Sequence, residues 1–87
     1  MTEMTEENQF LKFIRDFVGQ DATMAQMSRK LGISHTRLIY WAQSPTVTNF
    51  FTAARLMDVD LTIVRKTQDN YFIAVAERGD KKHTYQI

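Results

Sequence analysis

The stretch TMAQMSRKLGISHTRLIYWAQSPTVTNFFTAARLMDV, residues 23–59, alternates helix-forming segments with residues that end helices. Thr23 and Gln26 have the spacing of a capping box, in which each side chain bonds to the backbone N–H of the other residue, so a helix is expected from residue 24. Gly32 suits a tight turn, and Ser34 is placed to cap the next helix. The sequence therefore predicts two helices joined by a short turn.

The second of these helices is expected over residues 35–43, with Leu38 and Trp41 facing inward because they lie three residues apart. Pro45 ends it, since a proline disfavours the helical conformation of the residue before it. Thr46 is then placed to cap a further helix. The whole stretch predicts helix, turn, helix, loop and helix.

An amphipathic helix precedes this stretch. It is expected to begin near Thr5, after a frayed tail at residues 1–4, with Glu6 and Glu7 in the first turn, where the helix dipole favours acids. Its apolar residues repeat with the helical period: Phe10, Leu11, Ile14, Phe17 and Val18. Gly19 is expected to end it in the left-handed conformation.

After Val59 the apolar period changes from 3.6 to 2, which is typical of strands. Residues 59–64 alternate, residues 71–77 are rich in aromatic and β-branched side chains, and residues 83–87 predict a short third strand. Polar turn clusters at residues 68–70 and 78–81 separate them. A small antiparallel sheet is therefore expected at the C-terminal end.

The predicted fold is mainly α with a C-terminal β extension: a four-helix unit over residues 1–58 and a sheet over residues 59–87. The length allows one modest core. The fourth helix is expected to supply much of this core through Val47, Phe50, Phe51, Ala54, Leu56 and Met57. Asp58 stands where a helix-ending glycine is commoner.

Charge is distributed unevenly along the chain, although the net charge is only +1. Residues 1–21 hold five acids and two bases, and residues 58–87 hold five of each. Residues 22–57 hold no acid, and their bases are Arg29, Lys30, Arg37 and Arg55. Positive charge concentrated on a helix-turn-helix pattern indicates a phosphate backbone as the partner.

Several function classes are disfavoured by composition. The chain has no cysteine, which excludes disulfides, thiolate catalysis and cysteine-bound zinc. Its apolar runs are too short for a membrane helix and its N-terminus does not resemble a signal peptide, so we expect a cytoplasmic protein. His35 and His83 are the only histidines, with no acid at metal-ligand spacing to either, so we expect no enzyme, metal or cofactor. The tripeptide Arg78-Gly79-Asp80 is expected to be a turn.

Residues 23–59 resemble the Cro/C1-type helix-turn-helix of phage repressors and xenobiotic-response-element-like bacterial regulators. The resemblance rests on Thr-x-x-Gln at 23–26, Leu-Gly-Ile-Ser at 31–34, Ser-Pro-Thr-Val at 44–47 and the end of the fourth helix at 53–59. It covers 37 of the 87 residues and implies a lambda-repressor-like fold that binds double-stranded DNA.

The chain departs from the family pattern in several places. Met24 stands where the second helix usually begins with glutamine, which puts one expected phosphate contact in doubt. Ala42 stands where a glutamate is frequent, and Ser44-Pro45 where a glycine is frequent. A sheet also replaces the fifth helix of many members. The strand after the fourth helix is shared with antitoxin repressors, and Cro-like proteins dimerise through a sheet; both comparisons are analogies of fold.

The resemblance places a recognition helix at residues 35–43, with His35, Thr36 and Tyr40 facing the base edges. Histidine can donate to guanine or phosphate, and the threonine methyl suits the thymine methyl. Arg37 reaches a guanine edge or a phosphate, and we favour the phosphate. His35 could instead be an ordinary surface residue and Tyr40 could extend the core. Ile39 is a thymine contact, a dimer contact or simply an exposed residue, and the sequence does not distinguish these.

The remaining expected DNA contacts are Thr23, Met24, Arg29, Ser34 and Thr46. Arg29, together with its neighbour Lys30, could equally be an ordinary solvated surface.

The sheet has two interpretations. An exposed sheet edge favours pairing with a second copy, and the residues expected at that interface are Leu61, Ile63, Tyr71, Ile73 and Val75. In the alternative, the strands fold back on the first helix of their own chain.

Together these patterns predict a sequence-specific DNA-binding transcriptional regulator, a homodimeric repressor of its own operon, that reads the major groove with residues 34–43. Self-regulation is implied only by the resemblance. The alternative is an antitoxin-type module that masks a partner toxin and binds DNA secondarily. A long C-terminal toxin-binding extension would favour that alternative, and the sequence contains none.

Overall fold

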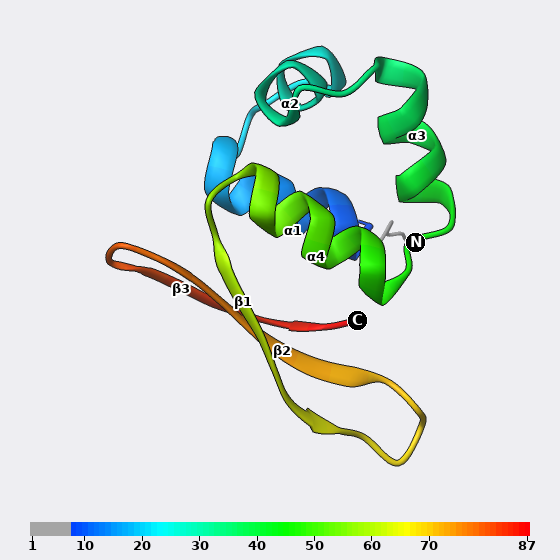
Figure 1. Cartoon of the computed structure of the whole chain (residues 1–87), viewed down its shortest axis with the longest axis vertical. Helices are drawn as coiled ribbons and strands as arrows, with labels where there is room; N and C mark the ends of the chain where they lie inside the picture. The colour runs from blue at the N-terminus through cyan, green and yellow to red at the C-terminus, as the bar shows by residue number, and fades with distance from the viewer. Residues whose placement is uncertain (1–7) are drawn as a thin grey trace, which may run out of the picture.

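A computed structural model describes residues 8–87 and shows four helices followed by a three-stranded antiparallel sheet (Figure 1). The helices are α1 (Gln9–Val18), α2 (Met24–Leu31), α3 (His35–Gln43) and α4 (Val47–Leu56). The strands are β1 (Asp60–Lys66), β2 (Phe72–Arg78) and β3 (Lys81–Gln86). The predicted general layout, helices first and a small sheet last, is confirmed.

The caps of α1 differ from those expected. Asn8 caps its N-terminus, where its side-chain oxygen accepts hydrogen bonds from the backbone N–H groups of Phe10 and Leu11. The expected start near Thr5, with Glu6 and Glu7 in the first turn, lies outside the described residues. Gly19 does end the helix, but with φ 158° and ψ 137° it lies outside the left-handed helical region, so that detail of the prediction is wrong. The positive φ is still one that residues with a Cβ rarely adopt.

The caps predicted for α2, α3 and α4 are confirmed. Thr23 and Gln26 form the full capping box. The Ser34 hydroxyl accepts from the backbone N–H of Arg37 at 3.0 Å, and the hydroxyl of Thr46 accepts from that of Asn49 at 3.1 Å. These short-range bonds explain why the helix boundaries were readable from sequence.

The chain leaves α4 through a residue with a left-handed backbone conformation. Asp58 takes φ 58° in the position after the C-cap Met57, where glycine is commoner. Phe51 and Leu56 are 39% and 42% exposed, so the prediction that they lie in the core is wrong. Their positions on the helix turn them away from Phe50 and Ala54, which face inward.

The strands pair in the order β1-β2-β3, both pairs antiparallel. The register between β1 and β2 shifts between Ile63 and Arg65, which marks a bulge near Val64. The observed strands begin one or two residues away from the predicted ones: β2 covers Phe72–Arg78, and β3 covers Lys81–Gln86. The connection between β2 and β3 is correspondingly shorter than the predicted four-residue turn.

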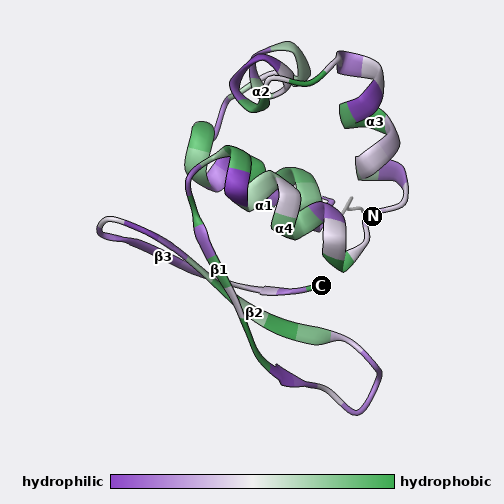
Figure 2. Ribbon diagram, in the orientation of Figure 1, coloured by the Kyte–Doolittle hydropathy of each residue, from purple (hydrophilic) through white to green (hydrophobic). Residues whose placement is uncertain are grey.

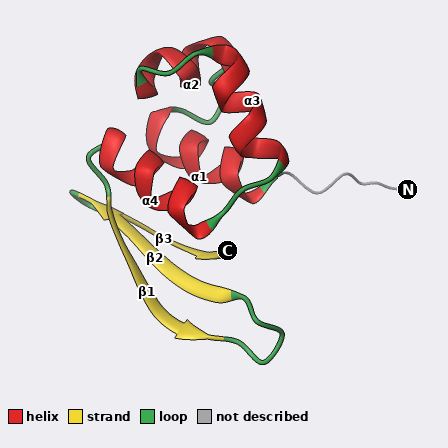
Figure 3. Ribbon diagram, turned by 45° about the vertical axis from the view of Figure 1, so that its right-hand side comes forward, coloured by secondary structure: helices red, strands yellow, loops and turns green. Residues whose placement is uncertain are grey.

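One face of the sheet packs against the helices, and the other is open (Figures 2 and 3). Alternation places Leu61 of β1, Ala74 and Ala76 of β2, and Tyr85 of β3 on the inner face, where all are buried. Phe13 of α1 packs its ring against that of Tyr85 at 5.2 Å between centroids. The sheet therefore folds back on the first helix of its own chain.

Arg78 fixes the end of β2 to the helical unit. Its guanidinium donates to the carbonyl oxygen of Met57 at 2.7 Å and to that of Phe17 at 2.6 Å, and it lies 5.5 Å from the centre of the Phe17 ring. The two carbonyls stand at the C-terminal ends of α4 and α1, where backbone acceptors lack helical partners. The bonds of Arg78 thus join α1, α4 and the sheet.

Candidate nucleic-acid interface

α2 and α3 are joined by a short turn. Gly32 takes φ 71° and ψ 31°, the left-handed conformation, and its N–H donates to the carbonyls of Ser28 and Arg29. The N–H of Ile33 also donates to the carbonyl of Ser28, at 3.0 Å. The conformation that turns the chain here is readily adopted by glycine. The turn fixes the direction in which α3 leaves α2.

α3 has one buried side and one open side. Leu38 is fully buried and Ala42 is 7% exposed. The predicted DNA-contacting side chains are all exposed: His35, Thr36, Arg37 and Tyr40. Tyr40 is 72% exposed, so it does not extend the core as the alternative interpretation required. Trp41, predicted to face inward, is partly buried, with its ring roughly perpendicular to that of Phe10.

The open side of α3 carries a shallow depression. Its lining residues are Ser34, Thr36, Arg37, Tyr40 and Trp41. Hydroxyl groups and a guanidinium stand beside two aromatic rings here, so the surface offers hydrogen bonds and flat apolar area together. Proteins use both hydrogen bonds and apolar contacts to bind nucleic acid.

Gln43 belongs to the same open side and was missed by the sequence reasoning. It is exposed in the last turn of α3. Its spacing of seven residues from Thr36 and three from Tyr40 places the three side chains on one helical face. The helical period, continued from Thr36 and Tyr40, could have found it. Ile39, 40% exposed, is also accessible.

Three helices present N-terminal turns capped by hydroxyl residues: Thr23 for α2, Ser34 for α3 and Thr46 for α4. Each hydroxyl accepts a backbone N–H, which leaves its own hydrogen free to donate, and all three residues are exposed. The partial positive charge of helix N-termini favours anions. These positions suit contacts with phosphate.

The other predicted contacts on α2 differ in accessibility. Arg29 is exposed in the last turn, beside the exposed Lys30. Met24 is partly buried and packs against the core, so only part of its side chain is accessible. Because the segment from Ala22 to Met57 contains no acid, no carboxylate within it reduces its positive charge.

The sheet residues expected at a dimer interface are placed differently from the expectation. Leu61 is 8% exposed and belongs to the core, and Ile63 packs against it. The helices of the same chain cover the inner face of β1, so these two side chains offer little surface to a second copy. Ile73 and Val75 are partly buried in the central strand β2, whose neighbours β1 and β3 cover both of its edges. Tyr71 is 48% exposed, in the β1–β2 connection.

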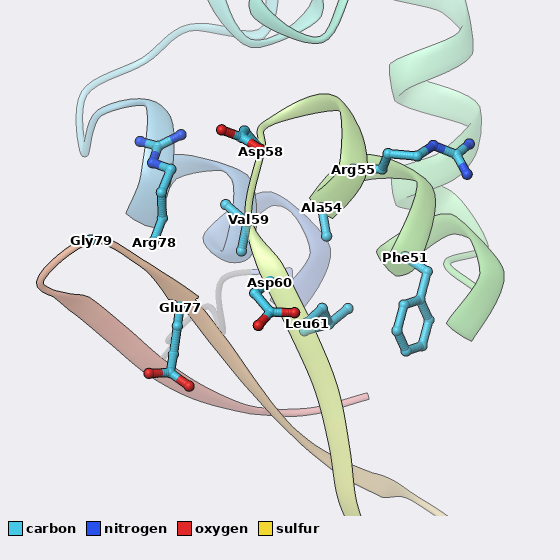
Figure 4. A pocket seen from close by; sticks show the side chains of 10 residues that line it. All are labelled: Phe51, Ala54, Arg55, Asp58, Val59, Asp60, Leu61, Glu77, Arg78 and Gly79. Carbon is cyan, nitrogen blue, oxygen red and sulfur yellow. The ribbon is translucent and has the colours of Figure 1, made fainter.

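A second depression surrounds the start of β1 (Figure 4). Phe51 and Ala54 of α4 and Leu61 of β1 form its apolar part. Its charged residues are Arg55, Asp58, Asp60, Glu77 and Arg78. The three carboxylates outnumber the two guanidiniums, and that of Arg78 is already bonded to two backbone carbonyls.

No group of three or more His, Asp or Glu side chains within residues 8–87 is placed to hold a metal ion. No helix in that range is both long enough and apolar enough to cross a bilayer. His83, one of the two histidines, lies on β3, where its Nδ1 is 3.8 Å from Asp16 Oδ2. No protein-family model, curated protein or solved structure matches this chain.

Proposed function

We propose that this chain is a sequence-specific DNA-binding transcriptional regulator of the helix-turn-helix type, with α3 as its recognition helix. The observation that carries the proposal is the two-sided character of α3. Leu38 and Ala42 fix its inner side in the core, while its outer side leaves polar and aromatic groups exposed in a segment without acids. The resemblance of residues 23–59 to the Cro/C1-type pattern supports it independently.

In this proposal the outermost line of α3 contacts base edges in the major groove. Thr36 and Tyr40 lie one turn apart on that line, and Gln43 continues it. A glutamine amide suits the adenine edge, and the threonine methyl suits the thymine methyl. His35 stands at the start of the helix, where residues of a recognition helix come closest to the bases.

Phosphate contacts supply most of the affinity. Arg37 on α3 and Arg29 on α2 are exposed, and Thr23, Ser34 and Thr46 offer hydroxyl donors at helix N-termini. A single unit makes few such contacts, so we propose that two copies bind together, with recognition helices about 34 Å apart, one turn of DNA. The regulator then acts by binding an operator, and no catalytic step is assigned to it.

The test is fluorescence anisotropy with two double-stranded DNAs, the sequence upstream of the gene and a scrambled version of it, at two salt concentrations. We expect tighter binding to the native sequence and weaker binding at higher salt. The variants Tyr40→Ala and Thr36→Ala should reduce the difference between the two DNAs, because they remove groups that face the bases.

Lys82→Ala is the matched control, because Lys82 is exposed on β3, a different element from those expected to contact DNA. It should bind like the unmodified protein. Equal and weak binding of the unmodified protein to both DNAs, followed by failure to enrich any sequence from a random duplex pool, would overturn the proposal.

A further inference from the structure

The free edge of β1 and the depression beside it form one continuous surface. β1 is an outer strand of the sheet, and within residues 8–87 only one of its sides pairs, with β2. An unpaired strand edge is a template for another strand. Phe51, 39% exposed, lines the depression together with Leu61, and Val64 on the strand itself is 54% exposed.

The charges along this surface change sign from one end of β1 to the other. Asp58 and Asp60 stand at its start, and Arg65 and Lys66 at its end; all four are exposed. Two copies of β1 placed side by side in parallel would bring like charges together. In an antiparallel arrangement, the acidic end of each strand meets the basic end of the other, which is the favourable cross-strand pairing.

We infer that a second copy of this chain binds here, with the two β1 strands antiparallel about a two-fold axis near the middle of the strand. The arrangement makes each acid–base contact twice, because a two-fold interface joins the same patch on both subunits. The bulge between Ile63 and Arg65 limits regular edge pairing, so the side chains of the depression, Phe51 above all, complete the contact. This inference deepens the proposed function, since it places the second copy that operator binding needs.

The other edge of the sheet fits a second copy less well. β3 is the shorter outer strand, and it begins with two exposed lysines, Lys81 and Lys82. Lysines on an outer strand oppose edge-to-edge pairing. β3 carries no acid to match them.

The test exchanges charges between the ends of β1 and measures molecular mass by analytical ultracentrifugation, without DNA. Asp60 and Arg65 are chosen because both are exposed and, by their pairing with Glu77 and Ile73, lie on the outer face of the sheet. We expect Asp60→Lys and Arg65→Glu each to raise the dimer Kd about tenfold or more, because each creates like-charge contacts twice. A mixture of the two variants should dimerise again, since the lysine introduced in one subunit then meets the glutamate introduced in the other.

Phe51→Ser and Leu56→Ser form a matched pair for the apolar part of the surface. Both residues are exposed on α4, but only Phe51 lines the depression. We expect Phe51→Ser to weaken the dimer and Leu56→Ser to leave it unchanged. Circular dichroism confirms that each variant stays folded.

Three results would overturn the inference: an unmodified protein that stays monomeric at every concentration, charge variants that dimerise normally, or a mixture that does not recover. None of them depends on DNA. Specific operator binding can therefore survive the failure of this interface, and the interface can survive the failure of the DNA-binding proposal.

Discussion

The phenol of Tyr85 on β3 donates a 2.5 Å hydrogen bond to Oδ2 of Asp16 on α1, a carboxylate whose side chain is only 4% exposed. The same carboxylate also accepts from Lys12 Nζ at 3.0 Å and from Gln20 Nε2 at 2.9 Å. Buried carboxylates are stable only where such donors surround them. This bond ties the last strand to the first helix across 69 residues of chain.

Removing this donor should destabilise the fold. We expect Tyr85→Phe, which keeps the ring packing against Phe13, to lower the free energy of unfolding by about 1–3 kcal/mol, because a buried acceptor loses its partner. Urea unfolding followed by circular dichroism measures the change. Tyr71→Phe is the control: Tyr71 is 48% exposed, and its loss of a hydroxyl should change little. Equal stability of Tyr85→Phe and the unmodified protein would show that the bond contributes nothing net.

The dependence of the free energy of unfolding on pH should also reflect the bonded pair Asp16 and Tyr85. Burial by itself raises the pKa of Asp16, but the hydrogen bonds from Tyr85, Gln20 and Lys12 and the charge of Lys12 outweigh it, so that pKa is lowered. The folded state therefore favours the ionised carboxyl. Its stabilising contribution is fully present above the unfolded pKa of about 3.9 and is lost as the pH falls through the folded value.

Tyr85 contributes a pH dependence of stability with the opposite sign. Burial, the hydrogen bond to Asp16 and the Asp16 charge raise the pKa of the phenol. The unfolded chain ionises this tyrosine near pH 10 while the folded chain keeps its proton, so stability should fall above about pH 10. Thermal unfolding measured across the acid and alkaline pH ranges tests both of these pH dependences. Asp16→Asn should flatten the acid limb, and an unchanged acid limb in that variant would contradict the assignment.

The sequence predicted what depends on neighbours along the chain and missed what depends on distant contacts. Thr23, Ser34 and Thr46 were identified as caps because each bonds to a backbone group three residues away. The bond from Tyr85 to Asp16 joins elements far apart, and no local pattern indicates it. Arg78 shows the same limit: its position suggested only a turn, although it holds the ends of α1 and α4.

The same division between local pattern and distant contacts applies to the candidate site. The outer positions of α3 were predicted from the resemblance to the Cro/C1-type pattern together with the helical period, and the structure leaves them exposed. Alternation in a strand identifies two faces but not which of them the helices cover, so the sequence could not show that Leu61 and Ile63 lie on the covered face. Leu61 lies in the core and Ile63 packs against it, so the surface that β1 leaves for a second copy is its outer edge.

Gly32 is expected to be sensitive to substitution although it has free space around it. Apart from Gly32 itself and its two chain neighbours, no atom of residues 8–87 lies within 4 Å of the position where a Cβ would stand, so Gly32→Ala creates no clash. Its cost is the left-handed backbone, about 1–2 kcal/mol for a residue with a Cβ. Gly32→Asn should recover part of the loss, because asparagine tolerates this conformation. Thermal unfolding compares the three proteins, and an alanine variant of full stability would contradict the prediction.

Arg37 and Tyr40 should affect DNA binding differently. If Arg37 contacts phosphate, Arg37→Ala weakens binding to the native and the scrambled duplex alike and reduces the log–log salt slope by about 0.9. Tyr40→Ala should instead weaken binding to the native duplex selectively, by about 1–3 kcal/mol, and leave the slope unchanged, since it removes a contact to a base. Anisotropy titrations at several salt concentrations separate the two effects. A selective loss with Arg37→Ala and an unchanged slope would place its guanidinium on a guanine edge, the contact that the sequence left as the alternative.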